Sequence, residues 1–291
     1  MKIMHHRLCI TDAEQSLVFY CQKLGMSLVA HEERADSQHY FLAYENTSSA
    51  LLELVYNPHQ YSPEIAPQPS RAEGYWKFSI AVPNLDQVRQ LLLACDVPVG
   101  DCFEVPDVAY LCHLQDPDGY CIELIQHTFL GNKQNCDPCS NSLPGVPVSL
   151  NLSTLRVKDI DASLVFYKAL GMKLLSRQVV PSRNMTLYFL SGYGEAAPGT
   201  DIDAVEIREW LWQRPYTLLE LQHIHGTESQ HDFRYRVGVQ TGFLGLDYQV
   251  ESLPDLISSL DTIPAEVLTP DRERKGIETK DPDGYCLRFF C

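Results

Sequence analysis

One segment of this chain occurs twice. DAEQSLVFYCQKLGM at residues 12–26 matches DIDASLVFYKALGM at residues 159–172, and the shared block SLVFY recurs after 163 − 16 = 147 residues. In each copy a short strand pattern leads to an Asp, then to apolar residues at helical spacing, and then to a Gly suited to the position after a helix. A chain of 291 residues has room for two domains of ~130–150 residues. The repeat therefore predicts two related domains.

The rest of each copy follows a second shared order. Further strand-like runs come first, then a helix-like segment at 84–95 or 253–261, and then the turn DPDGYC at 116–121 or 281–286. This turn has Pro at its second position and Gly at its fourth, so it closes a final hairpin. We expect an α+β fold of four βαβββ modules, two in each half. The predicted boundaries are 1–128 for the first domain, 129–148 for a polar, Pro-bearing linker, and 149–291 for the second domain.

The composition excludes several classes of function. A net charge of −15 with no tract of Lys or Arg argues against a protein that neutralises nucleic-acid phosphates. The chain has no run near the ~20 apolar residues that cross a bilayer, and its N-terminus lacks the apolar stretch of a signal peptide. We expect a cytoplasmic protein that binds neither nucleic acid nor membrane.

The cysteines are too dilute for a disulfide framework, because only ten occur in the chain. Cys136 and Cys139 have the C-x-x-C spacing of a zinc or redox pair. No second pair lies nearby and the stretch is rich in Pro, Asn and Ser, so an incidental pair in the linker is the favoured interpretation.

The second half carries the motifs of a known family in the family's order. They are LRVKDIDASLVFYKALGMKLL at 155–175, LYFLSGYGEAAPGTD at 187–201, EWLWQRPYTLLELQHIHGTE at 209–228 and DPDGY at 281–285. The first half matches through FYCQKLGM, LLELVYN, IAVPNLD and DPDGYCIEL. The chain resembles lactoylglutathione lyase (glyoxalase I) of the vicinal-oxygen-chelate superfamily, in the longer form with an insertion before the LLEL strand. The resemblance implies modules that form cupped mixed β-sheets, the fold shared with bleomycin resistance proteins.

The resemblance also implies four metal ligands per site. These are Gln or His on the first strand, Glu on the LEL strand, usually His on the strand before AVP, and Glu after DPDGY. The first half places His5, Glu53, Lys77 and Glu123 at these positions, and the second half places Leu152, Glu220, Gly245 and Arg288. Only the first-half set keeps three ligand types, which implies a zinc or nickel ion held by His5, Glu53 and Glu123.

The family's chemistry explains these residue types. Moving a proton alpha to a carbonyl requires a carboxylate base and a Lewis acid that stabilises the enediolate. By the resemblance, Glu53 and Glu123 would transfer the proton. Two pairings of the modules stay open: a cup formed within one domain, or a cup formed by the first module of one domain and the second module of the other.

Two basic residues stand where the family has metal ligands. Lys77 replaces the module-two His of the first half, and Arg288 replaces the second-half Glu. Clustered carboxylates in a low-dielectric pocket need a compensating cation, and an ammonium or guanidinium can serve instead of a metal. Our hypothesis is that Lys77 and Arg288 replace the metal with internal salt bridges, with Glu220 as a further pocket carboxylate.

The family's glutathione contacts are divided between the halves. The first-strand Arg is present as Arg156 but is Cys9 in the first half, and the Asn four residues after the Glu ligand is Asn57 but becomes Ile224 in the second half. No single module therefore carries both ligand-binding residues, which weakens glutathione as the cosubstrate.

Three functions follow from these observations. The first is isomerisation of a hemithioacetal, or of a related small molecule with vicinal oxygens, by a glyoxalase I-type lyase at one surviving cup. The second is binding or sequestration of a small molecule without catalysis, with salt bridges in place of the metal. The third is a metal-dependent oxygenase, which would need two His and one carboxylate. We expect a monomer or homodimer with a small-molecule ligand.

Overall fold

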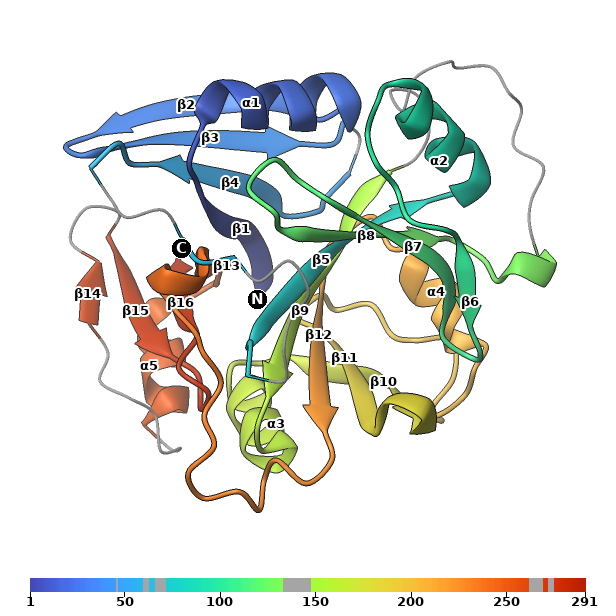
Figure 1. Cartoon of the computed structure of the whole chain (residues 1–291). Helices are drawn as coiled ribbons and strands as arrows, with labels where there is room; N and C mark the ends of the chain where they lie inside the picture. Colours follow the sequence, from blue (N-terminus) through green and yellow to red (C-terminus); the bar gives the residue numbers. More distant parts are fainter. Residues whose placement is uncertain (46, 60–62, 66–71, 133–147, 262–268, 272–274) are drawn as a thin grey trace.

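A computed structural model describes residues 1–45, 47–59, 63–65, 72–132, 148–261, 269–271 and 275–291. Within these residues the chain forms four modules in sequence, each with a first strand, a helix and three more strands (Figure 1). The α+β class and the four βαβββ modules are confirmed. Cys136, Cys139 and most of the predicted linker lie outside the described residues.

The first half supplies modules 1 and 2. Module 1 consists of β1 (Lys2–Ile10), α1 (Ala13–Leu17) continued by η1 (Val18–Lys23), β2 (Ser27–Arg34), β3 (Ser37–Ala43) and β4 (Leu51–Tyr56). Module 2 consists of β5 (Tyr75–Val82), α2 (Leu85–Ala94), β6 (Phe103–Val105), β7 (Ala109–Gln115) and β8 (Cys121–Gln126), followed by the short turn η2 (Leu130–Asn132).

The second half supplies modules 3 and 4. Module 3 consists of β9 (Ser149–Val157), α3 (Ile160–Ala169), β10 (Lys173–Val180), η3 (Pro181–Arg183), β11 (Met185–Ser191), the inserted α4 (Ile207–Trp212) and β12 (Leu218–Ile224). Module 4 follows η4 (Val239–Thr241) and consists of β13 (Phe243–Gln249), α5 (Leu253–Leu260), β14 (Thr269–Asp271), β15 (Gly276–Lys280) and β16 (Cys286–Phe290).

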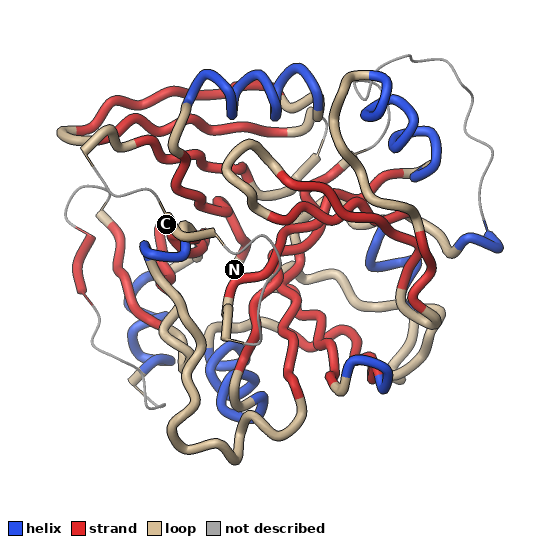
Figure 2. Tube along the Cα trace, viewed as in Figure 1, coloured by secondary structure: helices blue, strands red, loops and turns tan. Residues whose placement is uncertain are grey.

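The modules combine across the two halves of the chain. Modules 1 and 4 form one eight-stranded sheet, in the order β14-β15-β16-β13-β1-β4-β3-β2, and modules 2 and 3 form the other, β10-β11-β12-β9-β5-β8-β7-β6. Antiparallel pairing of β1 with β13 and of β5 with β9 joins the modules within each sheet. Figure 2 shows the two curled sheets, with the longer helices on their outer sides. Of the two pairings left open by the sequence, the structure has the one between domains.

Each of the four module helices begins at a side-chain cap. Asp12, Asn84, Asp159 and Ser252 accept a hydrogen bond from a backbone N–H in the first helical turn. Such a cap satisfies a donor that the helix cannot pair internally and contributes about 1 kcal/mol. The same local signal therefore starts the helix in every module.

The first helix differs from its repeat by one residue. The segment from Asp12 to Met26 is 15 residues long, whereas that from Asp159 to Met172 has 14. The extra residue is accommodated by the π-helical turn η1, in which the N–H of Leu24 donates to the carbonyl of Phe19 five residues earlier. A single-turn widening of this kind absorbs an inserted residue without breaking the helix.

The tyrosine of each SLVFY block ties its helix to a DPDG turn. The hydroxyl of Tyr20 donates to Asp116, and the hydroxyl of Tyr167 donates to Asp281, each at 2.8 Å. All four side chains are buried. The repeated sequence therefore produces a repeated buried contact between the helix of one module and the final turn of the next.

The insertion in module 3 closes one cup. Trp212 of α4 is almost fully buried, its ring lies 5.2 Å from that of Phe189, and its Nε1 donates to the carbonyl of Val108 at 3.0 Å. Trp212 is a packing residue that fills the inner end of the cup formed by modules 2 and 3.

Candidate functional site

The cup of modules 2 and 3, called here the Lys77 cup, contains a buried charge cluster. Lys77 Nζ lies 2.7 Å from Glu123 Oε1 and 3.1 Å from Glu220 Oε2. Lys77 comes from β5, Glu123 from the adjacent β8, and Glu220 from β12. The hydroxyl of Thr154 on β9 donates to Glu220 at 2.6 Å, and that of Ser79 donates to Glu123 at 2.7 Å. One ammonium therefore joins two carboxylates from different modules.

The electrostatics of this cluster favour its charged form. Burial opposes the charge on Lys77, but the carboxylates of Glu123 and Glu220 outweigh it and raise the pKa of Lys77. Burial also opposes ionisation of Glu123, but the Lys77 ammonium and the neighbouring His113 imidazole outweigh it and hold the pKa of Glu123 well below its usual range. At neutral pH, Glu123 is an ionised acceptor and a weak base.

A divalent ion does not fit the Lys77 cup. The ammonium of Lys77 takes up an oxygen of each carboxylate that the ion would need. Leu152, at the family's first-strand ligand position, lines the same cavity and offers no donor atom. The cavity over the cluster has a volume of about 40 Å³, which is room for about one water molecule.

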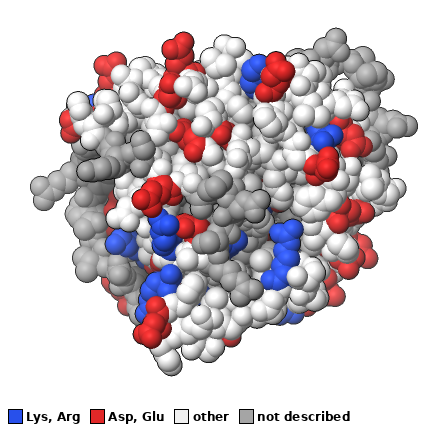
Figure 3. Space-filling view, in the orientation of Figure 1, with Lys and Arg blue, Asp and Glu red and all other residues white. Residues whose placement is uncertain are grey.

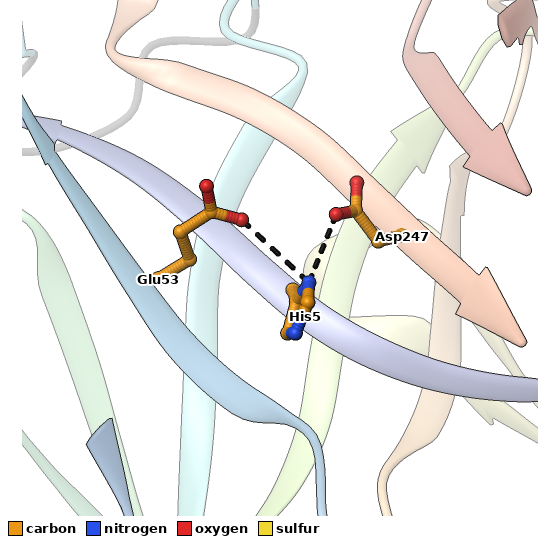
Figure 4. Close-up of side chains that lie close together, drawn as sticks. All are labelled: His5, Glu53 and Asp247. Carbon is orange, nitrogen blue, oxygen red and sulfur yellow. Dashed lines mark hydrogen bonds and ion pairs between the residues drawn. The ribbon is translucent and has the colours of Figure 1, made fainter. Parts of the chain in front are cut away.

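The cup of modules 1 and 4, called here the His5 cup, brings together a different set (Figure 4). His5 Nδ1 lies 2.9 Å from Asp247 Oδ2 and 3.6 Å from Glu53 Oε2. These residues come from β1, β13 and β4, the central strands of the sheet. One ligand-type atom from each of the three lies within 4.8 Å of the others. Histidine and carboxylates are ligands that zinc accepts in proteins.

Two guanidinium groups also occupy the His5 cup. Arg288 donates to both oxygens of Asp247, at 2.7 and 2.6 Å. Arg7 Nε lies 3.4 Å from Glu53 Oε2, and His39 Nδ1 lies 2.7 Å from Glu53 Oε1. Burial would raise the pKa of Asp247, but its hydrogen bond to His5 and the arginines outweigh burial and lower that pKa to about 2.

A divalent ion does not fit the His5 cup as it is built. The two arginines already balance the two buried carboxylates, and both oxygens of Asp247 accept from Arg288. Gly245 stands at the position where the family usually has its ligand His, and it has a positive φ of 109°. A side chain at Gly245 would overlap the carbonyl oxygen of Cys286, so a histidine cannot be placed there without moving the backbone.

The residues proposed from the sequence fall into two groups. His5, Glu53, Gly245 and Arg288 lie on the sheet of modules 1 and 4, and Lys77, Glu123, Leu152 and Glu220 lie on the sheet of modules 2 and 3. His5, Glu53 and Glu123 therefore do not converge on one ion, because the strands pair between modules of different halves. Asn57, after β4, and Arg156, on β9, are likewise divided between the sheets.

Several residues of the cups, His39 among them, were not singled out from the sequence. Asp247 stands two residues after Gly245 on the same strand face, and Thr154 stands two after Leu152, so strand alternation could have identified both. His113 pairs with Glu123 across the hairpin that the DPDG turn closes. Its Nε2 lies 3.3 Å from Glu123 Oε2, and counting back from the turn would have found it.

A large cleft lies beside the Lys77 cup. Its volume is about 1600 Å³, which exceeds the ~300–1,000 Å³ of common ligand pockets. The cleft and the small cavity over the charge cluster share four lining residues: Trp76, His113, Arg183 and Met185. The π-helical turn η1 also lines the cleft through Val18, Phe19 and Lys23.

The chain is similar to proteins of known family in both its sequence and its fold. The model of the glyoxalase/bleomycin resistance protein/dioxygenase superfamily matches residues 2–124. Lactoylglutathione lyase of Pseudomonas putida is 35% identical over 166 residues, which cover 52% of this chain and 94% of that protein. The chain belongs to the glyoxalase superfamily.

Other members of the glyoxalase superfamily match the full length. Lactoylglutathione lyase of Schizosaccharomyces pombe is 26% identical over 313 residues, which cover 99% of this chain and 96% of that protein. The crystal structure of glyoxalase I from Zea mays has a TM-score of 0.72 with 19% identity, covering 99% of this chain and 91% of that chain. The resemblance predicted from the sequence is confirmed.

The molecular surface carries charge of both signs. On the face in Figure 3, acidic and basic side chains are interspersed among uncharged ones. Among the described residues, no helix combines the length and the apolar character needed to cross a membrane.

Proposed function

We propose that this glyoxalase-superfamily protein binds a small organic molecule in the cleft beside the Lys77 cup, without a divalent metal. The observation that carries the proposal is the ammonium of Lys77, hydrogen-bonded to both Glu123 and Glu220. Breaking these bonds to admit an ion would leave a buried ammonium without its partners, which costs several kcal/mol. The Lys77 cup is therefore more stable with its internal salt bridges than with a divalent ion in their place.

The charge balance of the other cup supports the same proposal. In the His5 cup, Arg7 and Arg288 compensate Glu53 and Asp247. An added divalent cation would face two fixed guanidinium charges, and arginine does not lose its proton in proteins. In both cups, basic side chains of the protein thus occupy the place of a bound metal ion.

A lactoylglutathione lyase-type isomerisation is the second candidate. It is favoured by the family and by the convergence of His5, Glu53 and Asp247. In this alternative the three side chains would hold zinc or nickel after Arg288 moves away. The metal would supply Lewis-acid stabilisation, and Glu53 would be the carboxylate available for proton transfer. The oxygenase alternative has no comparable support, because only one His lies in the three-residue set.

Metal content and turnover distinguish the two candidates. The protein is purified without chelator, incubated with zinc or nickel, desalted and examined by elemental mass spectrometry. Turnover of the hemithioacetal of methylglyoxal and glutathione is then measured. We expect substoichiometric metal and no turnover. About one ion per chain that is lost in Asp247→Asn, together with turnover, would establish the lyase instead.

A further inference from the structure

The cleft beside the Lys77 cup has an arginine-lined end. Arg183 in η3 lines both the cleft and the cavity over the charge cluster. Its side chain is exposed, and no carboxylate of the described residues lies within 4 Å of its guanidinium. Arg156 lies at the same end, mostly buried, and its Nη1 donates to the carbonyl of Glu73 at 3.1 Å. Module 3 therefore presents two guanidinium groups to the cleft.

The wall next to these arginines is aromatic. The ring of His113 lies 5.9 Å from that of Trp76 and 6.0 Å from that of Phe103, at interplanar angles of 31° and 37°. The guanidinium of Arg156 lies 5.4 Å from the Trp76 ring centre. This tilted row of rings offers a surface for a planar, apolar group, and such contacts contribute beyond the apolar area they bury.

The remaining side chains at this end are apolar. Ile224 and Met185 line the cleft near the end of β12 and the start of β11. Ile224 stands where the family has an amide, so this cleft keeps the family's arginine but not the asparagine. The lining therefore favours a ligand with less hydrogen-bonding capacity than a peptide.

The acidic residues of the cleft lie on other elements. Glu14 belongs to α1, Asp96 follows α2, and Asp116 belongs to the turn before β8. Asp116 already accepts from the hydroxyl of Tyr20 and the N–H of Tyr120. An anionic group is therefore favoured at the module 3 end, beside Arg183 and Arg156, whereas the opposite end has these three carboxylates and one ammonium, that of Lys23.

We propose that this cleft selects an organic anion with a planar apolar body, of the aromatic sulfonate or carboxylate class. The anionic group pairs with Arg183 and Arg156, and the body lies against Trp76 and Phe103. This inference deepens the metal-free binding function proposed above and rests on it.

The test uses two fluorescent probes that differ in one group. 8-Anilinonaphthalene-1-sulfonate has the anion, and N-phenyl-1-naphthylamine has the same aromatic skeleton without it. Each is titrated into the full chain after chelator treatment. We expect the sulfonate to bind at least about fivefold more tightly than the uncharged probe, as one partly exposed ion pair provides about 1 kcal/mol. Equal affinities would overturn the proposal.

Variants locate the probe in the cleft. Arg183→Gln is expected to weaken sulfonate binding about fivefold and to leave the uncharged probe unchanged. Trp76→Leu is expected to weaken both probes. Arg34→Gln, on β2 of the other sheet, is the matched control and should change neither. If Arg183→Gln has no effect, or affects both probes equally, the anion is not bound at this end and the proposal fails.

The same titrations separate this proposal from the binding function on which it rests. If the metal measurement above finds about one ion per chain, the metal-free function fails whatever the probes show. If the metal-free protein binds both probes equally in a Trp76-dependent manner, binding in the cleft stands and only the preference for an anion is lost.

Discussion

The Nζ of Lys77 lies 2.7 Å from Oε1 of Glu123, on the adjacent strand of the same module. The same nitrogen lies 3.1 Å from Glu220, which belongs to the other half of the chain. Lys77 therefore links modules 2 and 3 at the place where the family's metal would link them. Its energetic role can be measured separately from any ligand.

Lys77→Met is expected to destabilise the protein strongly. Removing the ammonium leaves two buried carboxylates without their cation, which costs about 3–5 kcal/mol in comparable cases. The measurement is urea unfolding at neutral pH. Lys173→Met, at an exposed position at the start of β10, is the control and should change the free energy of unfolding by less than about 0.5 kcal/mol.

A second variant keeps this prediction decisive if Lys77→Met unfolds. Adding Glu123→Gln and Glu220→Gln removes the uncompensated charges, so the triple variant should be more stable than Lys77→Met alone. If the triple variant is the less stable one, the carboxylates are not the source of the cost.

Restoring two ligands should create a metal site in the Lys77 cup. Lys77→His with Leu152→Gln would surround the cavity with His, Gln, Glu123 and Glu220, the types that the resemblance implies. We expect about one zinc or nickel ion per chain by elemental mass spectrometry, with substoichiometric metal in the parent. Adding Glu220→Gln should abolish the gain. Metal uptake that survives this third substitution would place the ion elsewhere.

The fold was largely predictable because its signals are local. The caps at Asp12 and Asp159, the DPDG turns and the repeated SLVFY block each act within a few residues, and they recur in order. The sequence also identified Arg288, at the position that corresponds to Glu123, as a cation in place of a metal ligand. The expectation that Lys77 bonds to cup carboxylates agrees with its contacts to Glu123 and Glu220.

The same local signals could not predict which residues share each cup. Joining β1 to β13 depends on strand pairing across more than 200 residues, and each module's first strand is equally suited to a partner within its own half. Asp247 was missed because the family's position falls on Gly245, whose backbone packs on Cys286. Asp247, the next residue on the same face of β13, supplies the carboxylate instead.

The stability contribution of Asp247 should depend on pH. Its pKa is lowered to about 2 in the folded protein, against about 3.9 in an unfolded chain. A lowered pKa contributes stability that is present above about pH 4 and is lost as the pH falls towards 2, on the order of 2 kcal/mol. Asp247→Asn should therefore cost most at neutral pH and progressively less below pH 4.

The control for this pH dependence is an exposed ion pair. Asp203 pairs with Arg177 at the surface, so Asp203→Asn should change stability little at any pH. Urea unfolding of the three proteins at several pH values between about 3 and 7 gives the comparison. A cost of Asp247→Asn that stays constant with pH would show that the carboxylate charge is not what stabilises the His5 cup.

The two buried tyrosines of the repeat allow a test of whether the equivalent contacts in the two halves contribute independently to the free energy of unfolding. Tyr20→Phe and Tyr167→Phe each remove one hydrogen bond to a buried aspartate, Asp116 or Asp281, and should cost about 1–2 kcal/mol each. Each contact joins the helix of a module in one sheet to a turn of a module in the other sheet, and the two contacts share no partner. The double variant should therefore show the sum of the two costs within about 0.5 kcal/mol.

The cost of these substitutions should rise with pH. Burial raises the pKa of Asp116 and of Asp281 to about 7, while the tyrosine hydroxyl opposes that rise. A raised folded pKa gives stability that is present at low pH and is lost as the pH increases through 7. Without the hydroxyl the pKa rises further, so the loss should be larger near pH 8 than near pH 5. Urea unfolding at both values measures it, and an equal cost at the two would mean that the aspartates are already ionised near pH 5.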